Sequence, residues 1–488
     1  MTSVRKALLL SLVERYLLLV LAFGTNIVLA RLLMPEQIGV YSVSMAVLGI
    51  AQAVRDFGVG SYLIQERELS RGKIQAAFGV SLLLGAGMFV VVLLASSAVA
   101  AYYQEPRMAA TLQITSLNFL LLPFCTISLS LLRREMRFRR LLYVTIVAAA
   151  LGAATSVLLA AAGGGENSLA IGAVVTNLVT GLGSWLARSD KELLLPNLRE
   201  WRSVLSFGGK SSIAGVVTSV SMDANDLIVG KVLGFHSVAM LSRAQGLMSL
   251  FHRDLMGAVR NVALPAFAGA HRRSESLADP FLRSVALVTV FAWPFYGLMS
   301  VYSLEIIDLL FGRQWLPAAP LVPIFCGAGA VAALNALTPN LLVAVGRMDL
   351  LMRVELLMQP LRVLLIFVAA VVFETLRACA FAYLASAVIT LPVMWWFKRQ
   401  CVHDDMAALK RYFLTTACVS AAIVLPALIH VSWIGWSRST PIAIWQWTVV
   451  CLLGVVGGVI TVKRLRHPLA TEPIFQKLVG VFVGVRRA

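Results

Sequence analysis

Long apolar segments recur along the whole chain, and short polar stretches separate them. Most of these segments reach the roughly 18 to 20 residues that cross a hydrocarbon core of about 30 Å, so each predicts a transmembrane helix. The predicted spans are 8–33, 38–65, 75–103, 108–132, 141–162, 166–187, 204–233, 236–266, 280–303, 316–345, 350–373, 376–397, 412–431 and 441–462. The pattern therefore predicts an all-α polytopic membrane protein with about 14 transmembrane helices.

Composition supports this fold class. Of 488 residues, 59% are hydrophobic and 14% are charged, whereas a soluble domain has about 25% charged residues. The first apolar segment is longer than the roughly 7 to 15 apolar residues of a secretory signal. We therefore expect it to remain as a membrane span.

The net charge of +18 raises the question of nucleic-acid binding. Most Lys and Arg residues, however, lie at the two termini and in the loops that follow even-numbered spans. This asymmetry follows the positive-inside rule and predicts that both termini are cytoplasmic. The basicity is then a topology signal, and we expect no nucleic-acid partner.

The chain contains a weak internal repeat. The segment that starts at Val28 aligns without gaps with the segment that starts at Ile228, at a spacing of 200 residues. Such repeats are common in transporters. The predicted domains are residues 1–200 with six spans, residues 201–400 with six spans, and residues 401–488 with two additional spans and a tail.

Several charged residues lie inside predicted spans. The span 204–233 contains Lys210, Asp223 and Asp226. A charge at the centre of a membrane helix costs about 2.5 to 3.5 kcal/mol, so such residues usually face a wet or protein-lined interior. If this span and the next are antiparallel helices, Asp223 lies at the same depth in the membrane as Arg243, and Lys210 at the same depth as Asp254. We therefore predict these two pairs.

The same depth argument places Glu14 and Arg15 level with Arg55 and Asp56 near the cytoplasmic face. Two interpretations stay open for this group, a salt bridge at the membrane edge and a role in the transport pathway. In the span 236–266, Arg253 and Arg260 are seven residues apart and therefore about 10 Å apart on one helical face. Two such cations suit an elongated anion such as a diphosphate, although Arg260 alone is also placed to reach the cytoplasmic surface.

Other polar segments predict local roles. Five arginines between Arg133 and Arg140 are expected to anchor topology or to bind lipid phosphates. Residues 301–322 predict an outside loop whose Trp315 lies at the membrane interface. The span 350–373 has a polar face that contains Glu355, Gln359 and Arg362.

Catalytic chemistry has no recognisable motif in this sequence. Metalloprotease, serine-nucleophile and ATP-binding motifs are missing from the sequence. The six cysteines have no CxxC spacing, so we expect neither a disulfide framework nor a zinc site. We predict no enzymatic activity and no cofactor.

A series of motifs resembles a known family. These motifs are LARLLMPEQIGVYSV, AVRDFGVGSYLIQERELS, AAYYQEP, LLRREMRFRR, NDLIVGKVLG, ALPAFA, LLFGRQWLPAAPLV and AVGRMD. Their order between about residues 10 and 400 resembles bacterial polysaccharide transporters, the O-antigen and exopolysaccharide repeat-unit flippases of the multidrug/oligosaccharidyl-lipid/polysaccharide exporter superfamily. The segment HSVAML at 236–241 departs from the pattern, which has a Gly and a Tyr there.

The resemblance implies two six-helix lobes around a central cavity, in the bacterial inner membrane. It implies alternating access that moves an oligosaccharide linked to undecaprenyl diphosphate from the cytoplasmic to the periplasmic leaflet. It also implies polysaccharide polymerase and chain-length regulator proteins as partners. The alternatives are a drug exporter of the same superfamily and a membrane-bound polymerase or ligase.

Residue chemistry and resemblance together give one mechanistic hypothesis. The candidate substrate-binding cations are Arg15, Arg55, Lys210, Arg243 and Arg253. Asp223 and Asp226 are candidates for coupling to H⁺ or Na⁺, because they lie three residues apart on one helical face. An ordinary ion pair with Arg243 remains the alternative for Asp223.

Overall fold

The computed structural model describes residues 2–56, 58–66, 68–188, 195–197, 199–201, 221–403, 405–436, 438, 440–473 and 475–476. The side chains of residues 2–12, 253–255 and 258 lie outside this description. The chain divides into two compact units, Met1–Ala239 (the N-terminal unit) and Met240–Ala488 (the C-terminal unit). All regular elements in the described residues are helical.

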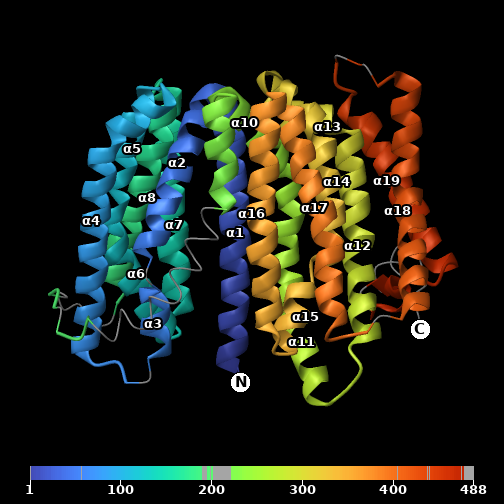
Figure 1. The fold of residues 1–488 in the computed structure, drawn as a ribbon, viewed down its shortest axis with the longest axis horizontal. Coiled ribbons are helices and arrows are strands. Elements are labelled where there is room, and N and C mark those ends of the chain that lie inside the picture. The colour runs from blue at the N-terminus through green and yellow to red at the C-terminus, as the bar shows by residue number, and fades with distance from the viewer. Residues whose placement is uncertain are drawn as a thin grey trace. The chain divides into compact units, whose positions relative to one another are not determined.

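The N-terminal unit is a bundle of long helices that lie side by side (Figure 1). Its helices are α1 (Thr2–Leu32), α2 (Pro35–Arg55), α3 (Val59–Gln65), α4 (Arg71–Tyr103), α5 (Arg107–Ser116), α6 (Asn118–Arg134), α7 (Phe138–Ala161) and α8 (Gly165–Ala187). Residues 221–232 are also helical. The boundary between the units falls within α10 (Phe235–Ser249).

The C-terminal unit continues the all-helical pattern. Its elements after α10 are the π-helix η1 (Leu250–Leu255), α11 (Met256–Arg272), α12 (Ala278–Val301), α13 (Ser303–Phe311), the 3₁₀-helix η2 (Arg313–Leu321), α14 (Val322–Asn335), α15 (Thr338–Ala344), α16 (Met348–Phe373), α17 (Leu376–Arg399), α18 (Met406–Ile434), α19 (Ile444–Arg464) and the 3₁₀-helix η3 (Pro468–Thr471). The last two long helices pack together, and α18 also packs on α12.

Twelve helices within the described residues are long and apolar enough to span a membrane. This confirms the prediction of an all-α multi-pass membrane protein. The predicted span 204–233 falls largely on residues outside the described part of the chain. The predicted span 236–266 corresponds to α10, η1 and α11, so it is divided by a π-helical turn.

Three further predicted spans are each built from more than one helix. The span 38–65 is wrong as a single helix, because α2 and α3 are separated at Gly58, whose φ of 64° is left-handed and ends regular α-helical geometry. The span 108–132 consists of α5 and α6, and the span 316–345 consists of η2, α14 and α15. Apolar periodicity predicts burial in the membrane, but it does not locate such breaks.

Local sequence explains where several helices begin. Pro35 occupies the first turn of α2, where its missing N–H costs nothing. The backbone N–H of Lys73 donates to Ser70 Oγ at 3.2 Å, and the N–H of Ala407 donates to Asp405 Oδ1 at 2.9 Å. These side chains satisfy donors that a helix start leaves without an intrahelical partner.

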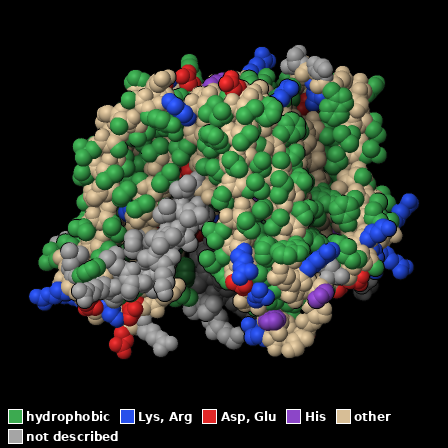
Figure 2. Space-filling model, viewed as in Figure 1, with side chains coloured by type: hydrophobic (Ala, Val, Ile, Leu, Met, Phe, Trp, Pro, Cys, Tyr) green, Lys and Arg blue, Asp and Glu red, His purple; other side chains and the backbone are tan. Residues whose placement is uncertain are grey.

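The helix surfaces are apolar along their middle lengths. Figure 2 shows hydrophobic side chains over the central part of the helices on the visible face, with Lys and Arg gathered near the helix ends. On α16 the exposed hydrophobic residues include Met352, Leu356, Leu364 and Val372. A soluble protein does not display such large apolar surfaces, so these faces are suited to contact with lipid.

Small residues bring α7 and α8 into close contact. A Cβ atom added to Gly152 would lie 2.8 Å from the carbonyl oxygen of Gly172, and one added to Gly172 would lie 2.8 Å from that of Gly152. The backbones therefore approach where neither residue has a side chain. This is the small-residue packing that stabilises membrane helix pairs.

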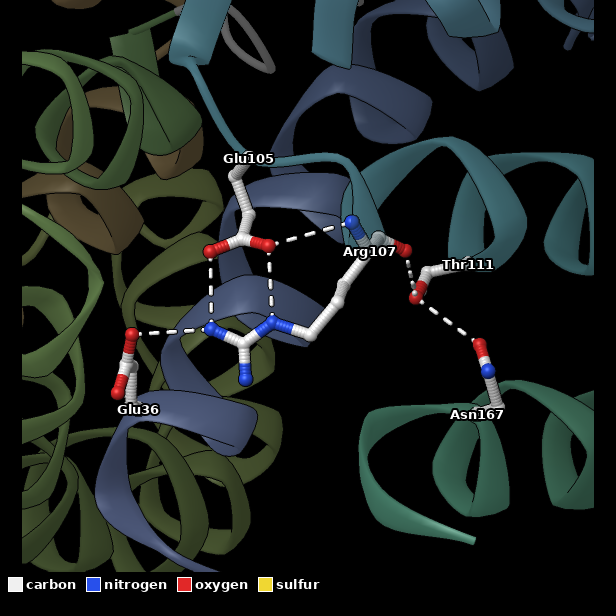
Figure 3. Close-up of polar contacts among 5 residues, drawn as sticks. All are labelled: Glu36, Glu105, Arg107, Thr111 and Asn167. Atoms are coloured by element: carbon white, nitrogen blue, oxygen red, sulfur yellow. Dashed lines mark hydrogen bonds and ion pairs between the residues drawn. The ribbon is translucent and has the colours of Figure 1, made fainter.

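A polar cluster joins several helix ends of the N-terminal unit (Figure 3). Arg107 Nε donates to Glu105 Oε1 at 2.8 Å, and its Nη2 donates to Glu105 Oε2 and to Glu36 Oε1, each at 2.9 Å. Thr111 Oγ1 donates to Asn167 Oδ1 at 3.2 Å. The cluster thus links the start of α2, the α4–α5 turn, α5 and the start of α8.

Candidate functional site

Arg55 is a deeply buried cation in the N-terminal unit. It is the last residue of α2, and only 4% of its surface is exposed. Within the described residues, its Nε and Nη2 atoms have no hydrogen-bond partner. A buried guanidinium with unused donors is costly unless an anion or another acceptor meets it. Arg55, predicted from its place inside a span, is therefore a candidate anion-binding residue.

The other members of the predicted charge group near Arg55 are arranged differently. Glu14 Oε1 accepts a hydrogen bond from Thr145 Oγ1 of α7 at 2.8 Å, and Arg15 is exposed. Equal depth in the membrane therefore did not identify the partner of Glu14. The reason is that a depth argument leaves the rotation of each helix about its own axis undetermined.

The two predicted ion-coupling residues lie on the helical residues 221–232 of the N-terminal unit. Asp223 and Asp226 are both half-buried. A Cβ atom added to Gly49 of α2 would lie 3.1 Å from the carboxyl carbon of Asp223, so this glycine makes room for the carboxylate. The neighbouring Asn225 is 4% exposed, and its Oδ1 has no hydrogen-bond partner in the described part of the chain.

Two predicted substrate-binding residues fall where the structure gives no side-chain description. Lys210 lies outside the described residues, and so does the side chain of Arg253. Arg253 belongs to the π-helix η1. The seven-residue spacing of Arg253 and Arg260 was interpreted for an uninterrupted α-helix, so that geometric argument no longer holds.

Arg243 of the C-terminal unit lies against aromatic rings. Its guanidinium carbon is 4.5 Å from the ring centre of Trp315 and 4.9 Å from that of Phe311. A cation above such rings is stabilised by their electron-rich faces. Trp315 itself is fully buried, so its ring packs inside the protein. The segment 301–322 is not an open loop but contains α13 and η2, and Trp315 belongs to η2.

A polar cavity of about 300 Å³ lies within the C-terminal unit. Residues of α11, α14, α15, α16 and α17 line it. Its polar lining includes Arg260, Arg362, Asn335, Asn340, Glu355 and Gln359. Two guanidinium groups beside amide side chains form a surface suited to an anionic, hydroxyl-rich group.

Hydrogen bonds hold part of this lining in place. Arg260 Nη2 donates to the His252 carbonyl oxygen at 2.8 Å, and Asn340 Nδ2 donates to the Arg260 carbonyl oxygen at 3.2 Å. Gln359 Nε2 donates to Glu355 Oε2 at 2.8 Å. The residue whose carbonyl Arg260 contacts belongs to the π-helix, and such π-helical turns are frequent at functional sites.

Two amide oxygens in this cavity have no hydrogen-bond partner among the described residues. They are Asn335 Oδ1 and Gln359 Oε1. A ligand with hydroxyl groups would supply the missing donors. The sequence indicated this surface only in part, because the polar face at 355–362 was visible but its association with Arg260 was not.

Three comparisons place these features among known proteins. The family model described as "Polysaccharide biosynthesis protein" matches residues 28–320. The lipopolysaccharide biosynthesis protein WzxC of Escherichia coli K12 is 23% identical over 332 residues, which are 66% of either chain. The succinoglycan biosynthesis transport protein ExoT of Rhizobium meliloti is 23% identical over 62% of this chain and 61% of ExoT. The matches thus span about two thirds or less of these relatives.

The fold also resembles that of a solved flippase. The structure titled "Lipid II flippase MurJ, inward closed conformation" matches with a TM-score of 0.74 over 93% of this chain and 98% of MurJ, at 11% identity. At this identity the likeness shows the fold alone. The relatives are named for polysaccharide biosynthesis and transport. The chain belongs to the polysaccharide biosynthesis protein family, whose model covers residues 28–320.

Proposed function

We propose that the protein is a flippase that moves a saccharide linked to undecaprenyl diphosphate across the bacterial inner membrane, with both chain termini in the cytoplasm. Membership of the family supports this proposal, as do relatives named for polysaccharide biosynthesis and transport. The MurJ-like fold supports it at the level of architecture.

The observation that carries the proposal is Arg55. A guanidinium that is 4% exposed and has two unused donor atoms within the described residues is an incomplete site in a membrane-spanning unit. Guanidinium binds phosphate oxygens through paired hydrogen bonds. A diphosphate that arrives from the cytoplasmic leaflet would complete the hydrogen bonding of Arg55.

The cavity of the C-terminal unit has the chemistry for the polar headgroup. Arg260 and Arg362 suit phosphate or acidic sugar oxygens, whereas Asn335 and Gln359 offer acceptors to sugar hydroxyls. The polyprenyl tail would stay in the lipid, since it is as apolar as the membrane core. Alternating access would then expose the headgroup to the periplasm.

Coupling to H⁺ or Na⁺ through Asp223 and Asp226 forms part of the same proposal. The carboxylates are three residues apart on a helix that also contains the buried Asn225. A carboxylate that exchanges a cation changes its charge and thereby biases a conformational equilibrium. Replacing Asp223 with Asn should leave substrate binding intact and make flipping independent of the ion gradient.

The test uses purified protein in liposomes that contain a fluorescent undecaprenyl diphosphate saccharide in both leaflets. A membrane-impermeant reductant destroys the fluorophore in the outer leaflet, so flipping appears as additional loss of fluorescence. We expect Arg55→Gln and Arg260→Gln each to slow flipping by about tenfold or more, because each removes charge-assisted hydrogen bonds.

Matched controls separate the site from general basicity. Arg133→Gln changes an exposed arginine of the N-terminal unit, and Arg272→Gln changes an exposed arginine on the same helix as Arg260. Both should flip substrate at the wild-type rate. Equal rates for Arg55→Gln and wild type would reject the site assignment. Export of organic cations without saccharide flipping would instead support a drug exporter.

A further inference from the structure

A second cavity, of about 400 Å³, lies within the N-terminal unit. It is bounded by α4, α6 and α8, and its apolar lining includes Phe78, Leu121, Phe124, Ile127, Leu178 and Leu182. Neither Arg55 nor the predicted ion-coupling aspartates line it. The cavity is therefore distinct from the proposed transport site and needs its own explanation.

The cavity is a groove that runs along the helices. From α8 it is lined by Asn177, Leu178, Gly181, Leu182, Trp185 and Arg188, whose spacing of three and four residues describes one helical face. This face extends for about 16 Å, given the rise of about 1.5 Å per residue. A groove of this length and direction fits an extended hydrocarbon chain.

The groove opens at the surface of the protein. Phe124 is 49% exposed, Leu182 is 55% exposed and Trp185 is 36% exposed. All three lie on helices that qualify as membrane spans. If this apolar hollow between membrane-spanning helices stayed empty, its lining side chains would lose dispersion contacts. Lipid acyl chains surround such helices and can fill it.

The two ends of the groove differ in chemistry. At one end Asn177 Nδ2 donates to Asn118 Oδ1 at 2.8 Å, which joins α8 to α6. At the other end Arg188, 6% exposed, lines the cavity. Arg140 reaches the same helix end, where its Nη1 donates to the Ala187 carbonyl oxygen at 2.6 Å.

We propose that this groove binds an anionic phospholipid, with one acyl chain between α6 and α8 and the phosphate beside Arg188 and Arg140. The order of groups, apolar along the span and cationic at the helix end, matches that of a phospholipid at the membrane interface. Guanidinium groups favour phosphate geometry. The positive charge selects an anionic headgroup over a zwitterionic one.

Trp185 is a built-in probe for the acyl chain. The purified protein is reconstituted in phosphatidylcholine bilayers and titrated with phosphatidylglycerol brominated on its acyl chains, because bromine quenches nearby tryptophan fluorescence. The chain has ten tryptophans, so the signal of Trp185 is taken as the difference between wild type and Trp185→Phe. We expect saturable quenching of that difference signal, and much weaker quenching by brominated phosphatidylcholine.

Paired variants test the charge and the hollow separately. Arg140→Gln should weaken phosphatidylglycerol binding by about fivefold, the effect of one cation near a membrane surface, whereas Arg139→Gln, at an exposed neighbouring position, should not. Gly181→Leu places a side chain in the groove and should abolish quenching. Gly87→Leu, at a position on α4 where a Cβ would meet no atom within 4 Å, should leave it unchanged.

The outcomes are decisive in either direction. If Trp185→Phe removes none of the quenching by brominated phosphatidylglycerol, no acyl chain occupies the groove and the proposal fails. Equal quenching by the two brominated lipids would overturn the anionic selectivity. Quenching by a brominated polyprenyl phosphate alone would assign the groove to the transported lipid instead. None of these readouts depends on flipping activity.

Discussion

Glu305 and Arg438 form a buried bidentate ion pair in the C-terminal unit. Arg438 Nε donates to Glu305 Oε1 and its Nη2 donates to Glu305 Oε2, each at 2.9 Å. The backbone N–H of Ile442 donates to Glu305 Oε1 at 3.2 Å. Glu305 is 2% exposed, so this pair fastens α13 to the segment between α18 and α19.

Removing one partner of this pair should be costly. Glu305→Ala leaves a guanidinium without its carboxylate in a buried site, and we expect unfolding to become easier by about 3 to 5 kcal/mol. Thermal unfolding of the purified protein in detergent measures the change. Glu275→Gln alters an exposed pair with Arg273 and should barely move Tm. A Tm for Glu305→Ala equal to that of wild type would contradict the assigned geometry.

The cluster around Arg107 should contribute less stability. Arg107→Ala removes the hydrogen bonds to Glu105 and Glu36, but the arginine side chain is 41% exposed. We expect a loss of about 1 kcal/mol or less, and a smaller loss at high salt because exposed charges are screened. Melting curves at two salt concentrations test this. A salt-independent loss would indicate that the packing of α5 matters more than charge.

The same cluster predicts a response to acid. Hydrogen bonds from Arg107 lower the pKa of Glu105. The ionised Glu105 carboxylate therefore contributes to the stability of the fold above the ordinary glutamate pKa, and this contribution is lost as the pH falls through the lowered folded-state pKa. Arg107→Ala should weaken this part of the acid sensitivity. Comparing Tm of wild type and variant across acidic pH provides the measurement.

The close contact of α7 and α8 depends on the lack of two side chains. Gly152→Ala and Gly172→Ala each place a methyl group against the facing helix, and we expect each to destabilise the protein by about 1 to 3 kcal/mol. Gly87→Ala, where a Cβ meets open space, serves as the control and should be neutral or slightly stabilising. Similar Tm values for all three variants would show that the helices separate without cost.

His467 should make the C-terminal unit sensitive to pH. The N–H of Leu469 donates to His467 Nδ1 at 3.2 Å, so Nε2 carries the proton toward Thr416 Oγ1 at 3.0 Å. Burial lowers the pKa of His467 to about 4, compared with about 6.5 for an unfolded histidine. At pH values between these two pKa values, His467 is protonated in the unfolded chain but neutral in the folded protein. The free energy of unfolding therefore decreases as the pH falls through this range.

The size of this effect is at most about 3 kcal/mol between neutral pH and pH 4. His467→Gln keeps an acceptor and a donor and should flatten the dependence of Tm on pH between about 6.5 and 4. His403→Gln, at an exposed histidine in the same unit, should keep the wild-type slope. An unchanged slope in His467→Gln would mean that other groups cause the acid sensitivity.

The sequence predicted the membrane-spanning character and most helix positions. Span length follows from the thickness of the hydrocarbon core. Backbone groups in that core must form hydrogen bonds within the protein, so an apolar run of this length is expected to form a transmembrane helix. Helix breaks were less visible. The separation of α2 from α3 at Gly58 and the π-helix at Leu250–Leu255 lie inside segments that were predicted as single spans.

The candidate site was predicted in part. Arg55 was identified because a charge inside a span needs compensation, and the structure shows it buried with unused donors among the described residues. Arg260 and Arg362 were not assigned to a common cavity. Their positions on α11 and α16 are 102 residues apart in the sequence, and no local pattern encodes such a contact.

Sequence alone therefore determined which segments lie in the membrane, because transfer of apolar side chains out of water is a local property of each segment. It also determined that the described spans are built from helices. Tertiary structure alone decided which polar residues meet, as with Trp315 against Arg243 and Glu14 against Thr145. That choice depends on the rotation and packing of each helix against its neighbours, which residue spacing does not specify.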